Sequence, residues 1–288
     1  MKKTLAAILA VASSASVATA QNYVAIESFK NASVGTQEST TISANSDLDA
    51  TSTYDSSYEY GGIYLEVVDD EATDYPTDLQ TADGKYITLA GNDDQFFRSI
   101  ASAAIVGTDN VASVAFAFRL DSLDAVAANN EVDYWRVLDI NATGTAASIM
   151  AFTVRAGQLR IQTNGLGAVD VVDLSTLTLG TWYVVAARYD RTTDGAGTFD
   201  AYLLNQATND VTTIANLTGL TASNKAEIGA IATAATFAAP TGTVDFQTSL
   251  DDFAIYSNTL STSQLLTAVK ADFGFPANAN VSDWNVFN

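Results

Sequence analysis

The chain of 288 residues contains no cysteine and no histidine. Without cysteine it forms no disulfide and offers no thiolate nucleophile, and without histidine it has no imidazole general base. A zinc site built on nitrogen and sulfur ligands is excluded for the same reason. Side-chain packing and backbone hydrogen bonds alone therefore have to hold the fold, which a chain of this length can manage.

Positive charge is scarce as well. Lys and Arg together number 13 against 33 Asp and Glu, which gives a formal net charge of −20. A surface of this sign repels nucleic acid and anionic lipid, so we expect neither as a partner. The same surface suits a hard cation such as calcium or a medium of high salt, and solubility alone would also account for it.

Long apolar runs are missing, and none approaches the roughly 20 residues that a membrane span requires. One short apolar run follows the basic start MKK and leads to the sequence ATA at 18–20. This order is typical of a secretory signal peptide with its cleavage site, although an uncleaved membrane anchor is the alternative. We expect residues 1–20 to be removed and the mature protein, from Gln21, to be secreted or held at a bacterial cell surface without inserting into the membrane.

Helical periodicity is limited to 261–272, where Ser261 is placed to cap a helix and Leu265, Leu266 and Val269 share a face. Most of the remaining chain is β-rich and punctuated by Gly, Asn and Asp. So many short strands predict an all-β fold, a jelly-roll sandwich of two antiparallel sheets in one domain over 21–288. The expected strands include 23–29, 111–120, 134–140, 148–154, 158–163, 182–189, 198–204 and 250–256.

Two tight turns and one polar segment complete this organisation. Turns at 156–157 and 193–197 would join their flanking strands into hairpins. The segment at about 31–60 is rich in Ser, Thr, Asp and Asn and has little apolar content, so it is too polar to form a core of its own. We expect it to be a polar excursion from the domain, either an irregular layer of loops or a partly disordered stretch.

Four blocks in the second half of the chain resemble the laminin-G-like, or concanavalin A-like lectin/glucanase, superfamily. The last block is the most specific, and the four together cover about 80 residues. One departure is Gln206, which stands where the superfamily has a glycine. The resemblance implies a jelly roll with a short C-terminal helix, and it implies that the acidic pair of the last block supports a loop. The blocks read GTWYVVAARYD (180–190), FDAYLLN (199–205), AEIG (226–229) and LDDFAIYSNTLS (250–261).

The superfamily that this resemblance suggests includes glucanases, whose catalytic strand reads E-x-D-x-x-E or E-x-D-x-E and carries a nucleophile and an acid/base. The most similar segment here begins with Glu131 and Asp133, but Arg136 stands where another carboxylate is required. Arg cannot protonate a leaving group near neutral pH. Lyases of this fold use His or Tyr bases with Arg and Gln partners, and we find no such cluster in the sequence. We therefore expect a protein without catalytic residues.

Binding residues are the remaining candidates. Tyr64, Tyr134 and Trp135 are aromatic side chains that could stack on a sugar ring. Acidic side chains form two pairs, Asp93 with Asp94 and Asp251 with Asp252, and either pair could contribute to a calcium site. Neither has the spacing of an EF-hand. The simpler interpretation of Asp93 and Asp94 is a solvated acidic loop. The simpler interpretation of Asp251 and Asp252 is that they accept structural hydrogen bonds.

These observations favour a secreted, non-catalytic carbohydrate-binding or adhesive protein, whose partner is an extracellular glycan or surface polymer. Two alternatives stay open. The first is a structural protein of a cell surface or extracellular filament that assembles with copies of itself. The second is a divergent glycan hydrolase or lyase, which release of reducing sugar would reveal.

Overall fold

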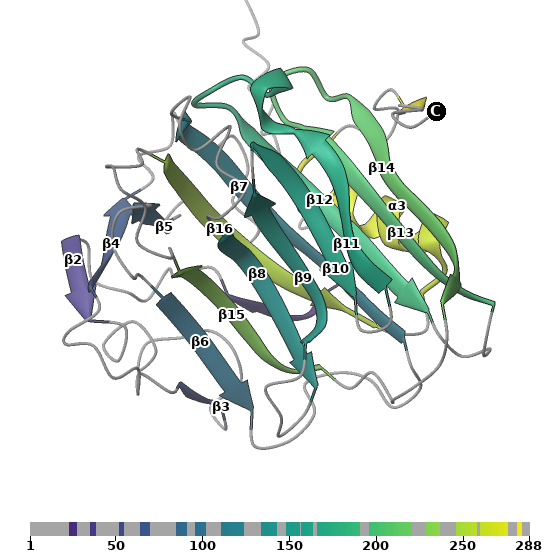
Figure 1. Cartoon of the computed structure of the whole chain (residues 1–288), viewed down its shortest axis with the longest axis horizontal. Coiled ribbons are helices and arrows are strands. Elements are labelled where there is room, and N and C mark those ends of the chain that lie inside the picture. The colour runs from purple at the N-terminus through teal and green to yellow at the C-terminus, as the bar shows by residue number, and fades with distance from the viewer. Residues whose placement is uncertain are drawn as a thin grey trace, which may run out of the picture.

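In the part of the chain that it describes, the computed structural model consists of two stacked β-sheets with one α-helix on the outside (Figure 1). The described part comprises sixteen segments. These are 23–27, 35–38, 52–54, 64–69, 85–90, 96–101, 111–123, 134–142, 148–155, 157–163, 166–190, 196–220, 228–236, 246–257, 260–275 and 281–283.

The larger sheet has ten strands, which come from both ends of the chain. They are β1 (Tyr23–Glu27), β2 (Gly35–Glu38), β4 (Tyr64–Asp69), β5 (Lys85–Ala90), β7 (Val111–Leu123), β12 (Trp182–Asp190), β13 (Gly197–Asn205), β14 (Val211–Leu220), β16 (Phe246–Tyr256) and β17 (Val281–Asp283). The order is β17-β14-β13-β12-β7-β16-β5-β4-β2, and β1 pairs with the second half of β16. Among the described pairings only β14 with β17 is parallel.

The smaller sheet has seven strands in the order β11-β10-β9-β8-β15-β6-β3. Its strands are β3 (Ser52–Tyr54), β6 (Phe96–Ala101), β8 (Tyr134–Ala142), β9 (Ser148–Arg155), β10 (Gln158–Thr163), β11 (Leu166–Asp173) and β15 (Ile228–Thr236). The expected hairpin between β9 and β10 is present, and Gly157 in its turn has a φ of 72°. The all-β jelly-roll prediction is thus confirmed.

The main core lies between the sheets and follows from alternation along β7. Phe116 and Phe118 are separated by one residue, so both point to the same face of the strand. Phe116 packs against Phe152 of the seven-stranded sheet at 5.0 Å between ring centroids and against Phe253 of β16 at 6.2 Å. Phe118 stacks on Tyr183 of β12 at 5.8 Å. Phe253 and Ile255 of β16 are both buried, each 1% exposed.

A second apolar cluster covers the other face of the ten-stranded sheet, where α3 (Thr262–Asp272) packs. β7 presents the small residues Ala115 and Ala117 on this face, which lets the helix approach the sheet closely. Helix residues Leu265 and Val269 are buried against them, and Trp182 belongs to the same cluster. Figure 1 shows α3 beside β13 and β14, behind the sheet. β7 is therefore buried on both faces, which explains its nearly continuous apolar sequence.

The N-terminus of α3 is fixed by local and long-range hydrogen bonds. Ser261 is the N-cap, as predicted, and it forms a reciprocal capping box with Gln264. The Arg188 side chain donates from Nε to the carbonyl of Leu260 at 2.8 Å, just before the helix. Thr262 donates to Asp200 of β13 at 2.7 Å. These contacts hold the first turn of α3 against β12 and β13.

The polar excursion predicted at 31–60 contains two short strands rather than an irregular layer throughout. β2 pairs with β4 in the ten-stranded sheet, and β3 pairs with β6 in the seven-stranded sheet. Periodicity did not reveal them, because strands of three or four polar residues carry too little hydrophobic pattern. Residues 1–20, the expected signal peptide, lie outside the described part of the chain.

Candidate functional site

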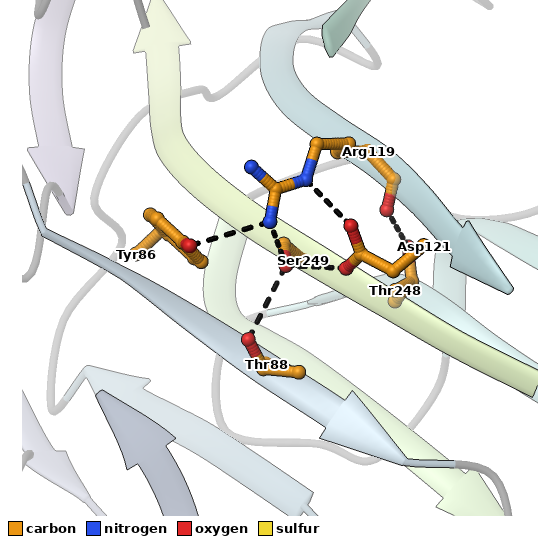
Figure 2. Close-up of polar contacts among 6 residues, drawn as sticks. All are labelled: Tyr86, Thr88, Arg119, Asp121, Thr248 and Ser249. Atoms are coloured by element: carbon orange, nitrogen blue, oxygen red, sulfur yellow. Dashed lines mark hydrogen bonds and ion pairs between the residues drawn. The ribbon is translucent and has the colours of Figure 1, made fainter. Parts of the chain in front are cut away.

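Six polar residues on three adjacent strands form a connected network, here called the Arg119 cluster (Figure 2). Arg119 lies directly opposite Trp182 of β12 on one side and Ser249 of β16 on the other, and Ser249 lies opposite Thr88 of β5. Register thus brings residues far apart in sequence into one row across the ten-stranded sheet. The members of the cluster are Tyr86, Thr88, Arg119, Asp121, Thr248 and Ser249.

An ion pair forms the exposed side of the cluster. Arg119 and Asp121 are two residues apart on β7, and Arg119 Nε donates to Asp121 Oδ1 at 2.5 Å. The Arg119 and Asp121 side chains are 15% and 18% exposed, so both are partly accessible to solvent. The pair therefore combines a fixed position with access to solvent.

Ser249 connects this ion pair to the sheet interior. Its hydroxyl donates to Asp121 Oδ2 at 2.6 Å and accepts from Arg119 Nη2 at 3.4 Å. Because a hydroxyl has one proton, and that of Ser249 goes to Asp121, Thr88 is the donor in the 3.2 Å contact between the Thr88 and Ser249 hydroxyls. Thr248 binds the backbone carbonyl of Arg119 at 2.8 Å. Each side chain is thus held by at least one neighbour, which restricts its rotamers.

Two aromatic rings support the guanidinium. The Arg119 Cζ atom lies 4.9 Å from the ring centroid of Tyr86 and 5.0 Å from that of Trp182, both within range of cation–π attraction. The two rings meet edge to face, with 5.4 Å between their centroids. They reach each other over β7 and β16, and Ala117 of β7 leaves room for them because it has only a methyl group. Tyr86 and Trp182 are 6% and 3% exposed, so their faces are already covered and do not offer a stacking platform. Trp182 is therefore a packing residue of the apolar cluster.

The electrostatics of the cluster keep Arg119 charged. Burial of the guanidinium acts to lower its pKa, but the hydrogen bonds with Tyr86 and Asp121 and their Coulombic attraction act in the opposite direction and prevail, so the pKa of Arg119 is raised above its ordinary value. A group that never releases its proton in the working pH range cannot serve as a general acid or base. The Arg119 cluster is therefore suited to holding hydrogen-bond partners in place rather than to transferring protons.

One part of Arg119 is not used within the cluster. Nε donates to Asp121, and Nη2 donates to Tyr86 and Ser249. The other terminal nitrogen, Nη1, has no hydrogen-bond partner among the described residues, and Figure 2 shows it on the side of the guanidinium away from Asp121. Asp121 has one donor on each oxygen, which leaves lone pairs on both. The unused donor and the unused lone pairs thus lie on opposite sides of the guanidinium.

The three aromatic residues predicted to bind sugar do not lie in one row. Tyr64 is the first residue of β4 and lies opposite Glu38 in the ten-stranded sheet. Tyr134 and Trp135 begin β8 in the seven-stranded sheet, where Tyr134 lies opposite Thr236. Their backbones therefore belong to different layers, and a joint role of the three residues in ligand binding stays a prediction.

Asp251 and Asp252 occupy a bulge in β16. Asp251 lies opposite Ala117, and the register then shifts by one residue before Ala254. Asp252 adopts a φ of 50°, a left-handed conformation that Asp tolerates better than most residues, and its amide donates to Asp251 Oδ1 at 2.8 Å. Both side chains are buried. This hydrogen bond agrees with the structural interpretation of the pair.

Calcium ligation by the two acidic pairs stays a prediction. Calcium takes six to eight oxygen ligands. Within the described residues no group of three or more Asp or Glu side chains gathers around Asp251 and Asp252 or elsewhere. Asp93 and Asp94 lie outside the described residues, as do Glu131 and Asp133 of the broken glucanase motif.

Sequence reasoning assigned no role to Arg119, Asp121 or Ser249, although one signal was present. Arg119 is the only charged residue within the apolar stretch VASVAFAFRL, and an acidic residue follows two positions later on the same face of the strand. A cation that interrupts a strand buried on both faces requires partners, because an unpaired buried charge is costly. The identity of the partners from β5 and β16 depends on strand order, which local sequence does not reveal.

Comparison with known proteins supports the fold alone. No family model and no curated protein matches the chain. Two structures of the botulinum neurotoxin serotype G binding domain, the second described as a receptor binding domain, superpose with TM-scores of 0.52 and 0.50 at 10% and 8% identity. Each covers 85% of this chain and 50% of the solved chain, so this chain spans half the length of those structures. An endo-β-1,4-glucuronan lyase from the fungus Trichoderma reesei matches at a TM-score of 0.46 and 12% identity, over 72% of this chain and 90% of the lyase.

Among the described residues no helix is long and apolar enough to cross a membrane. The described helix α3 has 11 residues and is amphipathic, with one side buried on the sheet. The jelly-roll architecture, with its ten-stranded sheet covered by α3 and bordered by the Arg119 cluster, is what the geometry and the comparisons together establish.

Proposed function

We propose that the protein is a secreted, non-catalytic glycan-binding or adhesive protein of the laminin-G-like/concanavalin A-like class. The observation that carries the proposal is the exposed edge of the Arg119 cluster. There a guanidinium and a carboxylate, 2.5 Å apart, are fixed by three strands and two aromatic rings yet remain 15% and 18% exposed. Glycans are recognised through hydroxyl groups, and a partly exposed guanidinium and carboxylate held in fixed positions provide the polar groups that such recognition needs.

The chemistry of the whole chain supports binding rather than catalysis. The chain has no histidine and no cysteine, and Arg136 interrupts the carboxylate pattern that begins at Glu131. Arg119 keeps its proton, since its pKa lies above the ordinary value. A glycosidase needs one carboxyl group that donates a proton and another that attacks or activates water. Asp121 is committed to Arg119 and Ser249 and has no second carboxylate beside it within the cluster.

The comparisons agree with this proposal at the level of fold. The serotype G structures, which share the architecture with TM-scores of 0.52 and 0.50, are described as binding domains, and the second is described as a receptor binding domain. A fold does not specify a function, so the comparison supports the proposal only together with the cluster itself. The predicted signal peptide places such a protein outside the cell, where glycans and surface polymers are available as partners.

The test is a glycan array probed with the protein from Gln21 onward, followed by calorimetry on each glycan that binds. Arg119→Lys is the informative variant, because lysine keeps the charge but lacks the planar fork that contacts Asp121, Tyr86 and Ser249. Arg160→Lys is the matched control, since Arg160 forms an ion pair with Asp170 on the seven-stranded sheet. We expect Arg119→Lys to reduce glycan binding at least tenfold and Arg160→Lys to leave it unchanged. Absence of binding to every glycan would contradict the proposal.

Catalytic silence is tested separately on β-glucans, agarose and carrageenan. We expect no release of reducing sugar and no change in that result for Glu131→Gln. Turnover that disappears in Glu131→Gln would make the protein an enzyme and overturn the proposal.

A further inference from the structure

We propose that the open edge of β14 pairs with the same edge of a second copy of this chain, so that two ten-stranded sheets join into one continuous sheet. This inference goes beyond the proposed glycan binding and rests on a different part of the molecule. Neither Arg119 nor its partners in the Arg119 cluster take part in it.

The outer side of β14 is paired over only part of its length. β13 runs beside the strand on one side, whereas β17 covers only 211–213 on the other. Beyond 213, the described residues include no strand on this outer side. Asn216, Thr218 and Gly219 are exposed, so solvent reaches this stretch. The backbone N–H and C=O groups of such an open edge are a template for another strand.

The sequence of β14 does not block this edge. Native sheets commonly protect open edges with charged side chains, especially lysine, or with proline. β14 reads VTTIANLTGL and has neither a charged residue nor a proline. The chain as a whole carries −20, so two copies repel each other, and an uncharged edge is where they meet at the smallest electrostatic cost.

Two bulges define which residues of β14 are available for regular pairing. The register with β13 shifts at Ile214 and again at Gly219, so neither residue has a direct partner on β13. β17 ends beside the first bulge, where its last pair joins Thr213 to Asp283. The stretch between the bulges, 215–218, keeps a regular ladder with β13. A second copy of β14 therefore pairs along this stretch.

The two faces of this stretch are self-complementary. Asp200 accepts a hydrogen bond from Thr262 of α3, so Asp200 and its direct neighbour Asn216 lie on the face that carries α3. Ala215 and Leu217 alternate with Asn216 and therefore lie on the inner face. Residues directly opposite each other in an antiparallel pair share a face. With Asn216 of both copies at the two-fold axis, Ala215 of one copy lies opposite Leu217 of the other, which sets a small side chain against a large one.

Pairing over so short a stretch predicts weak, reversible association. Stable protein interfaces bury about 1,600 Å² in total, and a contact centred on 215–218 buries less. We therefore expect dimers mainly at high protein concentration. Because both copies are negatively charged, salt should screen their repulsion and strengthen the dimer, whereas it would weaken an interface held by ion pairs.

Sedimentation velocity of the purified protein tests the association without any substitution, from about 10 µM to about 1 mM protein and at about 0.05 and 0.5 M NaCl. We expect a dimer whose dissociation constant falls at least about twofold at the higher salt concentration. Asn216→Asp places two like charges at the axis and should weaken the dimer at least about tenfold. Asn209→Asp is the matched control, because it makes the same change in the exposed turn of the same hairpin and should leave association unchanged.

Cysteine crosslinking locates the contact, because the chain has no cysteine of its own. Asn216→Cys places two thiols directly opposite each other, with about 4.5–5.5 Å between their Cβ atoms, and a disulfide requires only a small further approach. We expect mild oxidation to give a covalent dimer of Asn216→Cys at a rate at least about tenfold above that of Asn209→Cys. A monomer at every concentration, association that weakens with salt, or equal crosslinking at both positions would each overturn the proposal.

Discussion

Replacing Phe253 with alanine tests whether the inward face of β16 has been assigned correctly. The ring is 1% exposed and stacks on Phe116 at 6.2 Å, directly after the bulge at Asp252. Removal of a fully buried phenyl ring leaves a cavity and costs about 3–5 kcal/mol of the free energy of unfolding. For a domain of this size, each kcal/mol corresponds to roughly 2–4 °C in the melting temperature, so we expect a decrease of roughly 6–20 °C.

The assay is urea denaturation followed by tryptophan fluorescence, with Leu179→Ala as the control. Leu179 is 53% exposed in the turn before β12, so its truncation should change stability by less than about 0.5 kcal/mol. A double-mutant cycle with Phe116→Ala should return a coupling of about 0.5–1.5 kcal/mol, because the two rings are in contact. A cost for Phe253→Ala below about 1 kcal/mol, or a coupling near zero, would refute the assigned face of β16.

Three further predictions concern the helix, an exposed turn and calcium. Ser261→Ala removes the N-cap of α3 and should lower the free energy of unfolding by about 1 kcal/mol in the same assay, whereas an unchanged value would mean that Gln264 and the contacts from Arg188 suffice. Hydrogen bonds from the Ser175 hydroxyl and amide hold the pKa of Asp173 below its usual range. The charge of Asp173 therefore stabilises the fold above about pH 4, and this contribution is lost as the pH falls through the lowered pKa. The difference in stability between wild type and Asp173→Asn should be small but measurable at about pH 7 and absent near pH 2. If the acidic pairs bind calcium, calcium at about 100 times its dissociation constant should raise the free energy of unfolding by about 2.7 kcal/mol relative to an EGTA-treated sample. An unchanged melting temperature would exclude calcium as a ligand.

The fold was accessible from the sequence because its strongest signals are local. The β-rich segments that form β7, β9 and β12, the turn at Gly157 and the cap at Ser261 each act over a few residues, and each appears in the structure at the predicted place. β2 and β3 were missed because they are short and polar, and their pairing partners β4 and β6 supply what their own sequence lacks. Tertiary pairing rather than propensity forms these strands.

The candidate site was much less accessible, because its residues are brought together by strand order. Tyr86, Arg119 and Ser249 are separated by 33 and 130 residues in sequence and become neighbours only because β5, β16 and β7 are adjacent. The sequence favoured exposed aromatics and clustered acids, which are recognisable as residue types without knowing the topology. A cation within an apolar strand was the one local sign, and its partners could not be named without the register of β16.

The position of the Arg119 cluster also links the proposed recognition to stability. Outward-facing residues of β7 change along the strand from Ala115 and Ala117, which lie under α3, to Arg119, which stacks on Tyr86 and Trp182 at the edge of the same apolar cluster. The guanidinium therefore closes this cluster while its side chain stays 15% exposed. A substitution that removes the Arg119 guanidinium should loosen the packing of Trp182 as well as weaken binding. Loss of binding in such a variant is therefore informative only if its tryptophan fluorescence and melting temperature are measured too. Asp121→Asn touches neither ring, which makes it the variant in which recognition can be altered while the packing around Trp182 is retained.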